Sequence, residues 1–129
     1  MTAWTSDELT KIGTAEELEI ASLRGDGTLR KAVTIWVVRL DDDLYVRSVN
    51  GRTGVWFRGM QVRHEGHIQA GGVDKDVSFV EVPDASINDQ IDEAYRAKYR
   101  RYGERIVGTI VSPGARAATI KLVPRSTGS

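Results

Sequence analysis

Residues 19–59, EIASLRGDGTLRKAVTIWVVRLDDDLYVRSVNGRTGVWFRG, carry the pattern that decides the fold. β-Branched and aromatic residues fill 29–40 and 44–48, and turn-forming runs of glycine and aspartate bound them, which is typical of short antiparallel strands. Within 44–48, Leu44 and Val46 point to one face while Tyr45 and Arg47 point to the other. The pattern predicts two strands here, preceded by another over 16–24.

The sequence on the C-terminal side predicts three further strands, over 62–72, 73–82 and 115–125. The first of these is poor in apolar residues, so at least one of its faces should meet water or a partner. Turn signals recur about every ten residues, which favours a small antiparallel sheet or barrel. We therefore expect a mainly β domain of the α+β type with six strands.

Three helices are expected around these strands. Thr5 and Glu8 form a capping box that begins a short N-terminal helix. A second short helix should follow the third strand, over 54–61, and a long one should cover 87–103 with Ser86 as its N-cap. The long helix carries one apolar stripe at spacings of three and four, made of Ile87, Ile91, Tyr95, Tyr99 and Tyr102. Residues 104–111 read as a short helix or a linker.

Composition limits the classes of function. The chain has 129 residues, the size of one domain over 1–129, and its 18 basic residues balance its 18 acidic ones. Attraction of the whole molecule to nucleic acid or to an acidic membrane is therefore not expected. The N-terminal residues lack the apolar core of a secretion signal, and no apolar run approaches the roughly 18 residues of a membrane span. A cytoplasmic protein is the expectation.

Metal binding is not expected either. The chain has no cysteine, which excludes thiolate sites and disulfides. His64 and His67 stand three apart on a presumed strand, so their rings should point to opposite faces and cannot share an ion.

The turn after the third strand gathers groups that bind anions. Arg47 and Arg52 match phosphate oxygens in a bidentate manner, and the hydroxyl of Ser48 and the amide of Asn50 can donate to the same oxygens. Gly51 permits a close backbone approach, and Thr53 can cap the helix that follows, whose free N–H groups attract phosphate. The alternative is a solvated turn whose arginines pair with the aspartates at 41–43.

The strand before this turn offers a surface for a flat ligand. Thr34 and Trp36 project from one face two residues apart, giving one hydroxyl and one large ring. Equally, Trp36 can be a core residue, as most tryptophans are.

The order of these elements resembles that of small uncharacterised bacterial proteins grouped with the FMN-binding split barrels. Their superfamily includes pyridoxamine-phosphate oxidase-like proteins and reductases that use the deazaflavin coenzyme F420. The resemblance covers about residues 5 to 125 and is most specific in VRSVNGRTGVWFRG, residues 46–59. It implies a six-stranded antiparallel split β-barrel that forms a homodimer with cofactor clefts near the subunit boundary.

The resemblance also implies site residues. The cofactor ring rests against the second strand, which places Lys31, Thr34 and Trp36 on the ring side. The phosphate is held at the end of the third strand and in the next turn, by Arg47, Ser48, Asn50, Gly51, Arg52 and Trp56. Two departures stand out: Ile35 follows Thr34 where many deazaflavin reductases have proline, and arginine stands in the turn where lysine is frequent.

The leading hypothesis is an oxidoreductase in which the cofactor transfers the hydride while the protein orients its ring. Coenzyme F420 is preferred over FMN because Arg30, Lys31, Arg52, Arg58 and Arg63 could line a groove for its oligoglutamate tail. A cofactor carrier without turnover is the alternative. A third hypothesis is a small barrel that binds single-stranded nucleic acid through Tyr95, Tyr99, Arg100 and Arg101, although zero net charge disfavours it.

Overall fold

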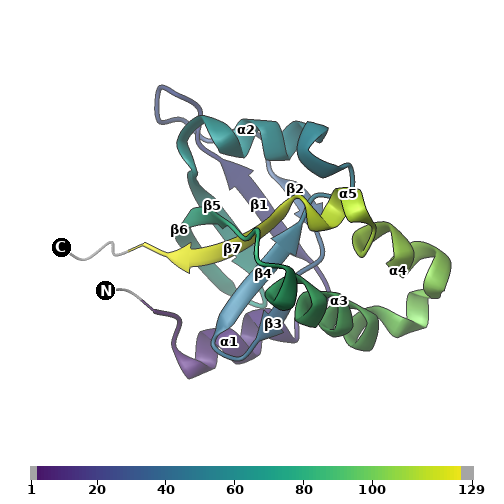
Figure 1. The fold of residues 1–129 in the computed structure, drawn as a ribbon. Helices are drawn as coiled ribbons and strands as arrows, with labels where there is room; N and C mark the ends of the chain where they lie inside the picture. Colours follow the sequence, from purple (N-terminus) through teal and green to yellow (C-terminus); the bar gives the residue numbers. More distant parts are fainter. Residues whose placement is uncertain (1–2, 126–129) are drawn as a thin grey trace.

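The computed structural model describes residues 3–125 and contains one antiparallel sheet of seven strands in the order β2-β1-β5-β6-β7-β4-β3 (Figure 1). The strands are β1 (Leu18–Ser22), β2 (Val33–Ile35), β3 (Val38–Leu40), β4 (Asp43–Arg47), β5 (Glu65–Ala70), β6 (Val73–Glu81) and β7 (Thr119–Pro124). The two edge strands, β2 and β3, are consecutive in the chain, so the sheet curls until its edges lie close together without pairing. This is an open, split barrel with seven strands instead of the six expected.

Five α-helices and two short 3-10 turns complete the described chain. The helices are α1 (Ser6–Gly13), α2 (Val55–Arg63), α3 (Ala85–Tyr99), α4 (Glu104–Ile110) and α5 (Pro113–Arg116), and the 3-10 turns are η1 (Gly51–Thr53) and η2 (Arg100–Tyr102). Helices α1 and α2 lie at opposite ends of the curled sheet, while α3 and α4 lie together beside β3 and β4 (Figure 1).

The main core fills the inside of the curl. Leu44 and Val46 of β4 point into it, as their alternation predicts, and α2 contributes Phe57 and Met60. Trp4 also lies in this core, where its indole Nε1 donates to the Leu122 carbonyl at 2.9 Å. The inside of the barrel is therefore packed with side chains, and a ligand has to bind elsewhere.

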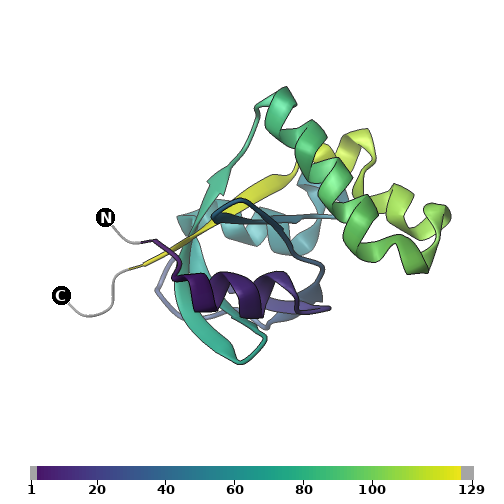
Figure 2. The ribbon, with the colours of Figure 1, turned by 90° about the horizontal axis from the view of Figure 1, so that it is seen from below.

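A second core covers the outer face of β3 and β4. Tyr45 points outward there and packs with Ile91, Tyr95 and Tyr99 of α3, all three fully buried. Figure 2 shows α3 and α4 side by side on this side of the sheet. The stripe expected on the long helix is thus confirmed in its central part, whereas Tyr102 lies in η2 and is 39 % exposed.

The predicted strand over 29–40 is wrong as a single element, because it breaks at Trp36 and Val37. The Val37 N–H donates to the Tyr99 hydroxyl at 3.2 Å, and the Val37 carbonyl accepts from Lys98 Nζ at 2.6 Å. Side chains of α3 thus satisfy the backbone groups that a strand neighbour would otherwise pair. This break produces the seventh strand.

Three helix boundaries also differ from the expectation. The capping box of Thr5 and Glu8 is present. However, Asp84 instead of Ser86 caps α3, and Gly54 instead of Thr53 stands at the N-cap of α2, without a side-chain cap. Residues 113–116, partly assigned to the last strand, form α5 because the Ser112 hydroxyl accepts from the Ala115 N–H.

Candidate functional site

A cavity of about 220 Å³ lies where the chain crosses from β2 to β3, at the split of the barrel. Thr34 and Trp36 line it on one side, and Ile106 and Ile110 of α4 line it on the other. Arg47 reaches it from the end of β4. The structure therefore brings together two residues expected on the ring side of a cofactor site and one expected on the phosphate side.

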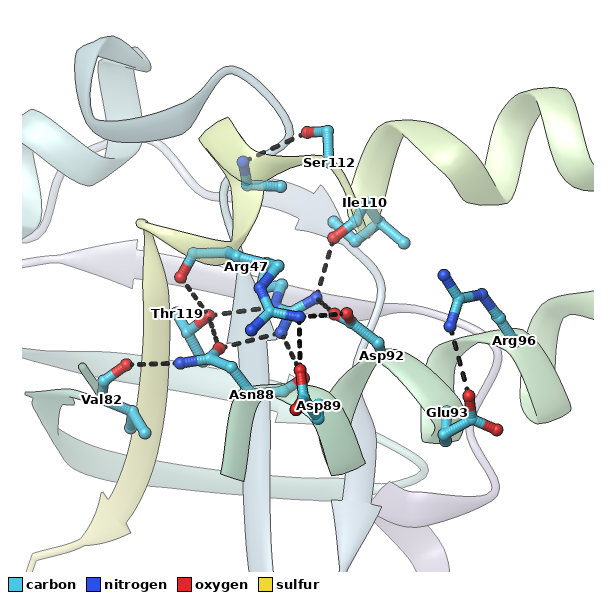
Figure 3. Close-up of polar contacts among 12 residues, drawn as sticks. Arg47, Val82, Asn88, Asp89, Asp92, Glu93, Arg96, Ile110, Ser112 and Thr119 are labelled. Carbon is cyan, nitrogen blue, oxygen red and sulfur yellow. Dashed lines mark hydrogen bonds and ion pairs between the residues drawn. The ribbon is translucent and has the colours of Figure 1, made fainter. Parts of the chain in front are cut away.

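Arg47 is fully buried, and its guanidinium is surrounded by protein acceptors (Figure 3). Nε donates to Thr119 Oγ1 at 2.9 Å, and Nη1 donates to Asp92 Oδ1 at 2.5 Å and to the Ile110 carbonyl at 3.1 Å. Nη2 donates to both the carbonyl and the side-chain oxygen of Asn88, at 3.1 and 2.9 Å. These five contacts use all five N–H groups of the side chain. Arg47 thus joins β4 to α3 and has no free donor for a ligand.

The turn after β4 is compact and internally bonded. Ser48 is buried, and its carbonyl accepts from the Gly51 N–H at 3.0 Å. Gly51 has a φ of +71°, a conformation that favours glycine, and a Cβ there would make a tight contact of 3.2 Å with the Gly114 carbonyl oxygen of α5. Asn50 and Val49 are exposed, and Val49 lines the cavity. The turn therefore contributes Val49 to the cavity, while Asn50 is exposed but is not among the residues that line it.

Two other expected residues lie away from this cavity. Arg52 Nη1 donates to Glu81 Oε1 at 2.6 Å and to the Ala117 carbonyl at 3.1 Å, and it lines a separate cleft of about 440 Å³ with Arg116. Trp56 is half-buried in α2, with its ring edge-on to Phe57 at 6.0 Å. Neither side chain is brought to the cavity beside Thr34.

Three cations without an ion pair to the described residues are Arg30 and Lys31, which precede β2, and Arg58 of α2. Arg30 lies against Gly59 of α2, and its Nε is buried without a hydrogen-bond partner. Lys31 and Arg58 are exposed. Among residues 3–125, the ion pairs of the structure include none of these three side chains. Sequence reasoning had placed Lys31 on the ring side of the site, and it had named Arg30, Lys31 and Arg58 among the basic residues that could line a groove for the cofactor tail.

The aromatic side of the cavity is held rigidly. Trp36 stacks on Tyr99, with ring centroids 4.0 Å apart and planes within 5°. Burial raises the pKa of the Tyr99 phenol and lowers the pKa of Lys98 to about 8. Since Tyr95 and Tyr99 are fully buried, neither ring is free to stack on a nucleobase as the third hypothesis required.

The two histidines do not share a site. His64 ends α2 at its C-cap, and His67 lies on the outer face of β5, where its ring nitrogens contact Asp76 and Asp74 of β6. Within residues 3–125, no group of three acidic or histidine side chains could hold a metal ion. No helix in that range is long and apolar enough to cross a membrane.

The sequence was compared with models of protein families and with curated proteins. A family model described as "Uncharacterized protein conserved in bacteria (DUF2255)" matches residues 8–122. No curated protein matches the sequence.

Three solved structures share the fold over most of their length. A pyridoxamine 5'-phosphate oxidase-like protein of Listeria innocua superposes with a TM-score of 0.66 and 17 % identity, over 92 % of this chain and 90 % of that one. The heme storage protein HutZ of Vibrio cholerae gives 0.63 and 14 %, over 98 % and 92 %. An FAD-binding protein of Mesorhizobium loti gives 0.57 and 21 %, over 96 % and 92 %. At identities this low, the superpositions show a shared fold and nothing more. The split barrel expected from the resemblance is thereby confirmed.

Proposed function

Because this chain belongs to the DUF2255 family of bacterial proteins and has the split-barrel fold, we propose that it binds a flavin-type cofactor and acts as an oxidoreductase. The observation that supports this most is the cavity at the split of the barrel, which joins Thr34, Trp36 and Val49 under α4. Proteins that share the fold include one described as FAD-binding. Coenzyme F420 is the preferred cofactor, and FMN is the alternative.

The volume of the cavity supports entry of only part of such a cofactor. Its volume of about 220 Å³ is below the roughly 300–1,000 Å³ typical of sites that enclose a whole ligand. The tricyclic ring would therefore enter, while the side chain and phosphate would lie outside it. The Thr34 hydroxyl is exposed on an edge strand and can bond a ring heteroatom.

The anionic part of the cofactor would run along β2 towards the unpaired cations. Lys31 precedes Trp36 by five residues, which is about 17 Å of extended chain. A buried guanidinium nitrogen without an acceptor, as at Arg30 Nε, is costly unless a water or an anion completes it. Arg30, Lys31 and Arg58 would thus hold the phosphate or the tail.

When bound, the cofactor would supply hydride transfer. The side chains of the cavity would orient its ring and keep water away from it. Ile106 and Ile110 of α4 would cover one face of the ring, and the rigid Trp36–Tyr99 stack would fix the position of the other wall. The network of Arg47 would hold β4 and α3, and with them the cavity's walls, at a constant separation.

Titration of the purified protein with FMN and with F420, followed by cofactor fluorescence, tests the binding. We expect micromolar or tighter affinity for one of them. Lys31→Gln and Arg58→Gln should each weaken it by about tenfold, the scale of one charge-assisted hydrogen bond. The matched control is Arg52→Gln, whose guanidinium already pairs with Glu81, and it should change affinity less than about threefold. The proposal would be excluded if neither cofactor binds with micromolar or tighter affinity.

Turnover separates an enzyme from a carrier. When the protein is loaded with reduced cofactor, addition of a quinone, a nitroaromatic compound or an enone should lead to oxidation of the cofactor and reduction of the added compound. Cofactor binding without oxidation by any of these acceptors would favour the carrier. Sedimentation of the protein should in addition give the mass of a homodimer, the assembly that we propose for this fold.

A further inference from the structure

A groove of about 500 Å³ lies between α3 and α4, and the proposed function has no use for it. Its apolar lining residues include Val107 of α4 and Val111, the C-cap residue of α4. Arg96 of α3 and Arg100, the C-cap residue of α3, line it four residues apart. Because Arg100 keeps helical backbone angles, the two side chains lie one above the other on the same face. This volume lies within the range of sites that enclose small molecules.

The groove is separate from the cofactor cavity, because α4 divides them. Ile106, Thr109 and Ile110 line the cofactor cavity, whereas Glu104, Val107 and Gly108 line the groove. Each set follows the three- and four-residue spacing of one helix face. A ligand in the groove would therefore contact the opposite face of the helix from a cofactor.

The charges on the rim of the groove favour a ligand that carries a single negative charge. Arg100 has no ion pair among residues 3–125, while Arg96 pairs with Glu93 at 3.3 Å in an exposed contact. An exposed pair of this kind is worth about 0–1 kcal/mol and yields easily. Glu93 and Glu104 also stand on the rim, so a polyanion such as nucleic acid would be repelled. One carboxylate on an apolar body matches the free guanidinium and the apolar lining residues.

Gly108 is a second, independent sign that the groove is open. Glycine in a helix interior costs about 0.5–1 kcal/mol relative to alanine. A Cβ at Gly108 would meet nothing within 4 Å, so no close packing requires the glycine. Its effect in the structure is to leave the α4 wall of the groove bare.

We propose that the groove between α3 and α4 is a binding site for a small amphipathic monocarboxylate. The carboxylate pairs with Arg100, with Arg96 as a second donor. The apolar part lies on Val107 and Val111.

Three probes of equal chain length test this: octanoate, octylammonium and octanol. Each is added to the ¹⁵N-labelled protein, and the backbone amides of Gly103 and Gly108 report on the groove. Octanoate should shift both amides with a dissociation constant at or below about 1 mM, while the other two bind at least tenfold more weakly. Arg100→Gln should weaken octanoate by about tenfold.

Substitutions at two glycines provide the structural control. Gly108→Leu fills the groove and should abolish the octanoate shifts at Gly103. Gly114→Leu is the matched variant, because a Cβ at Gly114 also meets nothing within 4 Å but lies outside the groove, and it should leave binding unchanged. Melting curves of all variants exclude a loss of fold.

Three results would overturn the proposal. Equal affinity for octanoate and octylammonium would show that Arg96 and Arg100 do not select a carboxylate. Octanoate shifts at Thr34 and Val49 that persist in Gly108→Leu would place the ligand in the other cavity. Absence of any saturable shift at Gly103 and Gly108 would show that the groove binds no such carboxylate.

Discussion

Removal of the Asp92 carboxylate should destabilise the fold more than any change at an exposed ion pair. Asp92 accepts from Arg47 at 2.5 Å and from Arg116 at 2.5 Å, and its side chain is only 8 % exposed. In Asp92→Ala, the fully buried Arg47 guanidinium keeps its charge but loses its counter-ion. Breaking a buried pair in this way costs about 3–5 kcal/mol, against a total stability of about 5–15 kcal/mol for a domain.

Urea unfolding followed by circular dichroism measures this cost. The variants should share the wild-type slope, so that a shift of the midpoint reports stability alone. Asp92→Asn should cost less than Asp92→Ala, because the amide oxygen still accepts from Arg47. Glu81→Gln is the control: it breaks the exposed pair with Arg52, which should be worth at most about 1 kcal/mol. A cost below about 1 kcal/mol for Asp92→Ala would refute the view that Arg47 is a desolvated charge held by α3.

Three further predictions concern the sheet and the edge of the second core. Gly66→Ala should cost at least about 3 kcal/mol in urea unfolding, since its Cβ would lie 2.1 Å from the Ala21 carbonyl oxygen; a cost below about 1 kcal/mol would contradict this packing. Burial lowers the pKa of His67, but hydrogen bonds to Asp76 and a second β6 aspartate outweigh it, so the pKa is raised. The stability that His67 contributes should therefore be complete below its unfolded value of about 6.5 and be lost as the pH rises through the folded value, so wild type should exceed His67→Gln by more at about pH 5.5 than at about pH 8.5; an equal difference would contradict it. NMR of ¹³C-methylated lysines should show Lys98 titrating near 8 because of its burial, whereas a value of about 10.4 would mean a solvated amine.

Local sequence patterns correctly predicted the features that depend only on residues close together in the chain. The alternation in β4 correctly assigned Leu44 and Val46 to one core and Tyr45 to the opposite face, because side-chain direction in a strand has a period of two. The capping box at Thr5 and the existence of the long helix followed from equally local chemistry.

Contacts between distant residues account for what the sequence could not predict. The strand over 29–40 breaks because Lys98 and Tyr99, some sixty positions away, bond the backbone of Val37. The sequence indicated that Arg47 binds an anion, but in the fold α3, α4 and β7 supply acceptors for all of its donors. Arg52 turns towards Glu81 for the same reason.

The candidate site was therefore predicted in part. Thr34 and Trp36 were singled out together from one short strand, and the structure places both in one cavity. Of the five basic residues expected to line the tail groove, Arg52 and Arg63 pair with Glu81 and Glu65, whereas the ion pairs within residues 3–125 do not include Arg30, Lys31 or Arg58. This selection depends on which carboxylates the fold brings near each cation. Which cations form ion pairs is decided by the folded chain, so the sequence composition could not predict which of them would be left for a ligand.

The affinity of FMN and of F420 for the wild type and for Thr34→Trp is the most direct test of the central claim. A tryptophan on the edge strand β2 suits the sheet but fills the cavity beside Trp36. The account predicts micromolar binding of one cofactor to the wild type and at least a hundredfold loss in the variant, with an unchanged melting temperature. Equal affinity of the two proteins, or micromolar binding of neither cofactor to the wild type, would contradict it.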